Sequence, residues 1–247
     1  MLKFLRRIRQ KLIIDGNLNR YLLYAIGEIL LVMVGILLAL QVNNWNQSNK
    51  DSLLENLYIE RLIFEIKKDT SFFKREIASN EKRNDAIRKF TSELSNPKGL
   101  DSVLLKEAHD FFAFGWFLPN FTVAKSTFND LSSTGQLSLI NNVKLRDELI
   151  AYYASYEDIL TGFEGNKHWL LPIDGKLSTE TNALQYDPIT RDIFGQSKDV
   201  GDLRSNSEFY KRVAAAHYWS NALAISTLQK KLKDAEVMLR KLEMELI

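Results

Sequence analysis

The chain has 247 residues, which is enough for one ordinary domain with appendages and a substantial core. Its 33 Lys and Arg nearly balance its 31 Asp and Glu, so the net charge of +2 gives no reason to expect a nucleic-acid partner. The absence of cysteine excludes disulfides, thiolate catalysis and cysteine-based zinc sites, and the scarcity of Gly and Pro favours long helices over short strands.

Residues 1–20 are predicted to be a cytoplasmic, basic amphipathic segment. Leu2, Leu5, Ile8 and Leu12 recur at helical spacing, with basic residues elsewhere on the wheel. Such a helix lies at the membrane surface against anionic lipid head groups. Alternatively, these basic residues only set the membrane topology of the chain, and both interpretations stay open. The predicted membrane-surface residues are Lys3, Arg6, Arg7, Arg9 and Lys11.

Residues 21–43 are predicted to form a transmembrane helix. The apolar stretch from Tyr21 to Leu40 would extend about 30 Å, the thickness of the hydrocarbon core of a bilayer. Glu28 costs roughly 2.5–3.5 kcal/mol on insertion scales, whereas each Leu, Ile or Val contributes roughly 0.3–0.6 kcal/mol in favour. The stretch contains twelve such aliphatic residues, so the sum favours insertion.

The flanking residues indicate an uncleaved signal-anchor with its N-terminus in the cytoplasm. A cleavable signal peptide would have a shorter apolar region ending at small residues, and the sequence after Ala39 offers no such site. Before the span there are six basic residues and one acidic residue, Asp15. Residues 41–60 contain one basic residue, Lys50, and three acidic residues. Because Lys and Arg stay on the cytoplasmic side, residues 44–247 are expected outside the membrane, on the periplasmic side.

One side of the predicted span is suited to contact another helix. Its members alternate at spacings of three and four, and most are small, which permits close approach. An intramembrane carboxyl is costly against lipid and should face a partner helix or a wet cavity. We therefore expect a homo-oligomer or pairing with another membrane protein. The residues of this predicted interface are Ala25, Glu28, Val32, Gly35 and Ala39.

Glu28 also allows a second interpretation. Energy-transducing membrane complexes contain single-pass accessory subunits in which one acidic residue takes part in ion or proton coupling. Those subunits work beside a multi-span partner and have a recognisable periplasmic module, which this sequence does not show. A protonated packing residue is the simpler interpretation.

The remainder of the chain, 44–247, is predicted to form an antiparallel helical bundle with long, coiled-coil-like helices. The first helix, about 51–94, would end at Asn96-Pro97-Lys98-Gly99, and a short helix at about 101–112 would follow. The seam of the first helix is polar at Asn80 and Asn84. Its predicted members are Ile59, Ile63, Ile66, Thr70, Phe73, Ile77, Asn80, Asn84, Ile87, Thr91 and Leu94.

Further helices are predicted towards the C-terminus. A helix should stop at Gly135, and Asn141 or Asn142 should cap the next one. Residues 170–204, which contain Pro172 and Gly175, are expected to be irregular, with a short helical turn near 189–194. The capping box Ser205-x-x-Glu208 is expected to open the last helix. Its heptad seam consists of Leu228, Leu232, Ala235, Leu239, Leu242 and Leu246.

No catalytic, cofactor-binding or metal-binding signature occurs in the sequence. His109, His168 and His217 are isolated from one another, and His217 lies among alanines, which favours a packed histidine over a metal ligand. Phosphate-binding loops, nucleophile elbows and calcium loops are missing from the sequence. We therefore expect no enzyme, no cofactor and no small-molecule substrate.

Three stretches resemble a family of short single-pass membrane proteins of Gram-negative bacteria, known only as a domain of unknown function. They are LRRIRQKL, YLLYAIGEILLVMVGILLALQVNNWN and FNDLSSTGQLSLINN followed by LRDELIAYY, and the likeness covers nearly the whole chain. The membrane block is the most specific part, and Met33 is its chief departure. The resemblance implies an inner-membrane location and a periplasmic domain, and it supplies no activity.

Together these features predict a membrane-anchored helical scaffold or sensor that acts through protein–protein contacts. The alternative is an accessory single-pass subunit of a membrane complex in which Glu28 takes part in coupling. Membrane lipids and a second protein are the expected partners.

Overall fold

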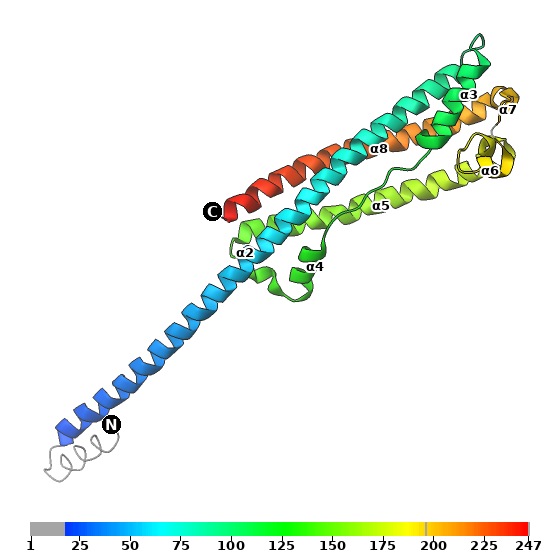
Figure 1. The fold of residues 1–247 in the computed structure, drawn as a ribbon. Helices are drawn as coiled ribbons and strands as arrows, with labels where there is room; N and C mark the ends of the chain where they lie inside the picture. Colours follow the sequence, from blue (N-terminus) through cyan, green and yellow to red (C-terminus); the bar gives the residue numbers. More distant parts are fainter. Residues whose placement is uncertain (1–17, 196, 247) are drawn as a thin grey trace. The chain divides into compact units, whose positions relative to one another are not determined.

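The computed structural model describes residues 18–195 and 197–246, and every regular element within these ranges is a helix. The predicted all-α fold is therefore confirmed. The chain divides into two compact units, residues 1–56 and residues 57–247, here called the N-terminal and the C-terminal unit. Helix α2 (Leu18–Leu94) contributes residues to both units (Figure 1).

In the N-terminal unit, the described residues belong to α2. Every side chain from Ile29 to Leu40 is exposed, and the most apolar stretch of 18 residues has a mean hydropathy of 2.5. Exposing so much apolar surface to water would cost about 25 cal/mol per Å². Among the described residues, α2 is the one helix long and apolar enough to cross a membrane.

Three long helices form the core of the C-terminal unit. They are residues 57–94 of α2, α5 (Val143–Glu180) and α8 (Ser207–Glu245), drawn side by side in Figure 1. Helix α8 runs antiparallel to α2, because Lys67 pairs with Glu243 whereas Arg88 reaches Tyr218. It is also antiparallel to α5, since Glu148 pairs with Lys241 and Asp174 with His217.

Helices α2 and α5 consequently run in the same direction, a detail that the sequence pattern did not predict. Between them the chain returns through α3 (Asp101–Asp110), the π-helix η1 (Phe111–Gly115) and residues 116–125, which have no regular structure. Figure 1 shows residues 116–125 as a long thin segment that ends at α4 (Ser126–Ser133). Because this return has no long helix, the second long helix repeats the direction of the first.

The predicted seams of α2 and α8 face the core. Ile59, Ile66 and Phe73 of α2 are fully buried, as are Leu228 and Leu242 of α8. Asn80 and Asn84 are also buried, so the polar positions lie in the seam as expected.

The apolar side chains form two clusters. One includes Phe73, Phe121, Tyr156 and Leu228, and the other includes Phe90, Phe111, Leu177 and Tyr210.

Two predicted helix boundaries around α4 and α5 are confirmed. Gly135 has φ +71°, the left-handed conformation that glycine adopts most easily after a helix. The short 3-10 helix η2 (Gln136–Leu139) follows it. Of the two candidate caps, Asn142 is the one used, because its side-chain oxygen accepts a hydrogen bond from the Leu145 N–H at 3.1 Å.

The expectation of irregular structure from residue 170 is wrong, because α5 continues through Pro172 to Glu180. A proline inside a helix removes one backbone hydrogen bond and costs about 3 kcal/mol or more. Leu170 and Leu177 on either side of it are fully buried. Burial of two leucines contributes about 3–6 kcal/mol, which can offset that cost. The irregular part starts only after Glu180.

The predicted capping box at Ser205 is also wrong. Ser205 ends the short helix α7 (Gly201–Ser205), and its hydroxyl donates to the Asp202 carbonyl. Helix α8 starts at Ser207 after Asn206. Before α7 lie the 3-10 helix η3 (Ala183–Gln185) and α6 (Arg191–Phe194), and α6 is the short helical turn predicted near 189–194.

Candidate functional site

The predicted interface residues of the span all lie on α2 in the N-terminal unit. Ala25 and Glu28 are half-buried, and Val32, Gly35 and Ala39 are exposed. A side chain added at Gly35 would meet no atom within 4 Å, and the same holds for Gly27. The helical repeat of 3.6 residues places the five positions along one side of α2. The predicted membrane-surface residues Lys3, Arg6, Arg7, Arg9 and Lys11 lie outside the described residues.

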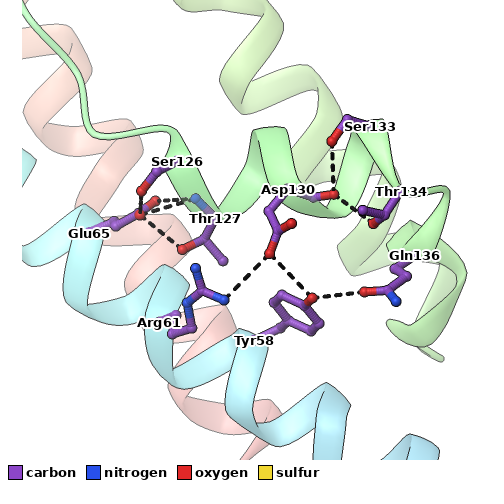
Figure 2. Close-up of polar contacts among 9 residues, drawn as sticks. All are labelled: Tyr58, Arg61, Glu65, Ser126, Thr127, Asp130, Ser133, Thr134 and Gln136. Atoms are coloured by element: carbon purple, nitrogen blue, oxygen red, sulfur yellow. Dashed lines mark hydrogen bonds and ion pairs between the residues drawn. The ribbon is translucent and has the colours of Figure 1, made fainter.

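In the C-terminal unit, Glu65 of α2 binds the start of α4 (Figure 2). Its carboxylate accepts hydrogen bonds from the hydroxyls of Ser126 and Thr127 and from the Thr127 N–H, the last at 3.1 and 3.2 Å to its two oxygens. A carboxylate at this position satisfies free N–H groups of the first helical turn and interacts favourably with the helix dipole. Glu65 therefore acts as an N-cap supplied by another helix.

Asp69 lies one helical turn further along α2 and holds the adjacent chain segment. Its Oδ1 accepts the Ala124 N–H at 2.8 Å, and its Oδ2 is buried without a hydrogen-bond partner among the described residues. The side chain is only 3% exposed. Burial, opposed by the Ala124 N–H and supported by the nearby Glu65 charge, raises the pKa of Asp69 to about 7. This carboxyl can change its charge near neutral pH.

Other polar contacts fix the far end of α4, as Figure 2 shows. The Tyr58 hydroxyl donates to Gln136 Oε1 at 2.7 Å, and Arg61 lies 3.5 Å from the Asp130 carboxylate. Both α2 residues thus reach groups at the end of α4 or just after it. Exposed pairs such as Arg61–Asp130 contribute little to stability, so this pair adds less to the attachment than the buried hydrogen bonds of Glu65.

A group of buried tyrosines on α5 lies close to Asp69 and Lys231. The Tyr156 hydroxyl donates to the Tyr152 hydroxyl at 2.5 Å. The Lys231 ammonium donates to the Ser155 hydroxyl and lies 5.0 Å from the centre of the Tyr156 ring. Burial lowers the pKa of Lys231 and raises the pKa of all three tyrosines, Tyr152, Tyr153 and Tyr156. Burial therefore favours the neutral form of each of these groups.

His217 confirms the expectation of a packed histidine. It is fully buried, its Nε2 lies 2.8 Å from Asp174 Oδ1, and its ring stacks on Trp116 with centroids 6.1 Å apart. Ser220 lies one turn away, so Asp174, His217 and Ser220 include the three residue types of a catalytic triad. The Ser220 hydroxyl is fully buried and has no hydrogen-bond partner among the described residues, so the geometry lacks an accessible, activated nucleophile.

The described part of the chain contains no group of three or more His, Asp or Glu side chains that could hold a metal ion. His109 lines a small pocket of about 120 Å³ together with Asp187, and His168 is exposed on α5. The three histidines thus lie in separate environments, as their spacing in the sequence suggested.

A groove of about 560 Å³ lies between α2 and the segment before α4. Helix α2 contributes two phenylalanines and three basic side chains to it, and residues 122–124 form its other side. Sequence reasoning found neither this groove nor the acidic pair Glu65 and Asp69. Their only signal is two carboxylates four residues apart beside an apolar seam, which is common on long helices. The residues that Glu65 and Asp69 bind lie at least 55 positions away in the sequence.

Comparison with known proteins gives no further guide to function. A scan against known protein families finds no match, and neither the curated proteins nor the solved structures contain a significant match to the chain.

Proposed function

We propose that this protein is a single-pass membrane scaffold or sensor that acts through protein–protein contacts and associates with itself through α2. The observation that carries the proposal is the acidic residue Glu28 on the small-residue side of an otherwise apolar stretch of helix. In a bilayer, such a group is most stable against another helix.

The orientation belongs to the same proposal. The six basic residues before the span, against Lys50 alone in 41–60, support a cytoplasmic N-terminus and a C-terminal unit on the outer side of the membrane. The resemblance of the membrane block to short Gram-negative proteins supports a bacterial inner membrane, with the C-terminal unit in the periplasm. A scaffold that joins copies in the membrane needs no catalytic residues.

Site-specific crosslinking tests the self-association. Because the natural chain has no cysteine, an Ala39→Cys variant has a single thiol, and a dimer with this face at its centre should form a disulfide in membranes. Adding Gly35→Ile or Glu28→Leu should reduce the crosslink about five- to thirtyfold, since each contact contributes about 1–2 kcal/mol.

Gly27→Ile is the matched control. It adds the same side chain about 120° around the helix from the centre of the proposed interface, in equally open space. Equal crosslinking in the Gly27→Ile and Gly35→Ile variants would exclude this interface. Recovery of a constant multi-span protein in place of a homo-oligomer would instead favour the accessory-subunit function.

A further inference from the structure

The groove beside α2 combines exposed aromatic surface with positive charge. Phe64 is 60% exposed, although its neighbours on the seam side of α2 are buried, and Phe72 is half-buried. The Lys68 ammonium lies 4.3 Å from the centre of the Phe64 ring. The exposed ring offers a partner apolar contact area, and the neighbouring ammonium offers a positive charge beside it.

The basic residues of the groove are only partly neutralised. Lys67 pairs with Glu243 at 2.8 Å, but neither Lys68 nor Arg75 lies within 4.0 Å of a carboxylate among the described residues. The one acid that lines the groove, Asp69, is 3% exposed. The open surface of the groove is therefore positive and suits a negatively charged partner.

The length of the groove suits a short extended peptide. Its α2 residues run from Phe64 to Arg75, which corresponds to about 16 Å along a helix. Five residues of an extended chain, at about 3.3 Å each, cover the same length. A peptide of this length could place acidic side chains at both Lys68 and Arg75.

The other side of the groove offers main-chain groups. Among the described residues, the N–H groups of Thr122 and Val123 form no hydrogen bond, whereas the next one, that of Ala124, is bound to Asp69. Thr122 is exposed and Val123 is half-buried, so the Thr122 N–H is the better placed of the two to pair with the backbone of an extended partner.

From these features we propose that the groove between α2 and residues 122–124 binds an acidic, extended segment of a partner protein, with Phe64 and Phe72 receiving an apolar side chain. This inference rests on the proposed function, because it names the class of partner through which a scaffold would act. The phenylalanine contacts provide apolar burial, and Lys68 and Arg75 select for acidic residues.

Fluorescence anisotropy with a defined probe tests the proposal. The full chain, in nanodiscs of zwitterionic lipid, is titrated against a labelled peptide Glu-Phe-Glu-Val-Glu-Phe-Glu and against the same peptide with Lys in place of Glu. The acidic peptide should bind, and its affinity should fall as salt rises. The double variant Lys68→Glu/Arg75→Glu should weaken binding at least tenfold, and Phe64→Ser should weaken it without changing the salt dependence.

The matched control is Lys98→Glu/Arg240→Glu, which makes the same change in net charge at two exposed positions outside the groove. The substituted residues are exposed, and unchanged thermal unfolding by circular dichroism verifies that the variants fold. Three results would overturn the proposal: no binding to the wild type, equal loss in both double variants, or preference for the Lys peptide. If the protein floated with anionic vesicles and did not bind the peptide, the groove would be assigned to lipid, and the proposal would also be overturned.

A failure of the groove proposal can be distinguished from a failure of the proposed interface in the membrane span. Peptide binding in nanodiscs depends on the groove, whereas the Ala39→Cys crosslink depends on the span. Peptide binding by the Gly35→Ile variant should equal that of the wild type, even where the crosslink is lost.

Discussion

The Asp69 carboxyl is buried within the C-terminal unit, close to Glu65 and to the hydroxyls of Tyr152, Tyr153 and Tyr156. Its pKa is raised from an ordinary value of 3.8 to about 7, so the folded protein holds a proton that the unfolded chain loses at lower pH. The folded state therefore binds more protons between about pH 4 and pH 7. Its stability should fall as pH rises through this range and should level off above about pH 7.

Asp69→Asn tests this pH dependence. The amide oxygen can still accept the Ala124 N–H, but the side chain no longer ionises. Urea unfolding at pH 8 should show the variant more stable than the wild type by about 1–3 kcal/mol, and the difference should shrink towards pH 4.

Asp85→Asn is the control for a carboxylate on the same helix. The Asp85 side chain is 49% exposed and is hydrogen-bonded to Lys89, which lowers the pKa of Asp85. This substitution should cause only a small loss of stability at neutral pH, with no gain at pH 8. A wild-type stability that does not change between pH 5 and pH 8 would contradict the assignment of Asp69.

At the scale of elements, α4 is a helix of only eight residues and depends on contacts outside itself. Glu65→Ala removes every hydrogen bond from α2 to the start of α4 and leaves the Thr127 N–H without its acceptor. Loss of such a buried, charge-assisted acceptor costs about 1–3 kcal/mol. Hydrogen exchange measured by mass spectrometry should therefore show faster exchange for the amides of 126–133.

Glu60→Ala, an exposed change on the same helix, should leave the exchange of α4 unaltered. If the Glu65→Ala variant also kept the wild-type exchange rates in α4, the cap would have no role in holding that helix.

The long helices could be predicted because each has a regular apolar seam, as Ile59 to Leu94 and Leu228 to Leu246 show. Local turn chemistry predicted the helix stop at Gly135 and a cap at Asn141 or Asn142, because these features depend on neighbouring residues. The extension of α5 through Pro172 could not be predicted, because local propensity opposes it and tertiary contacts, such as the burial of Leu170 and Leu177, sustain it. Glu65, Asp69 and the groove depend on residues 122–127, which are distant in sequence, so no local pattern indicates them.

At the scale of the whole molecule, function depends on which side of the membrane each part occupies. The charge asymmetry around the span predicts that residue 10 lies in the cytoplasm and that residue 48 lies outside it. Residue 10 lies outside the described part of the chain, and its assignment rests on the sequence. The groove proposed here would then meet only partners that are exported or that expose a segment on the outer side.

Thiol labelling decides this topology, since the natural chain has no cysteine that could react in the background. In intact spheroplasts, a membrane-impermeant maleimide should label Ser48→Cys, which lies at an exposed position of α2. The same reagent should label Gln10→Cys only after the membrane is permeabilised. The reverse pattern would place the C-terminal unit in the cytoplasm. Labelling of both positions before permeabilisation would mean that α2 lies on the membrane without crossing it.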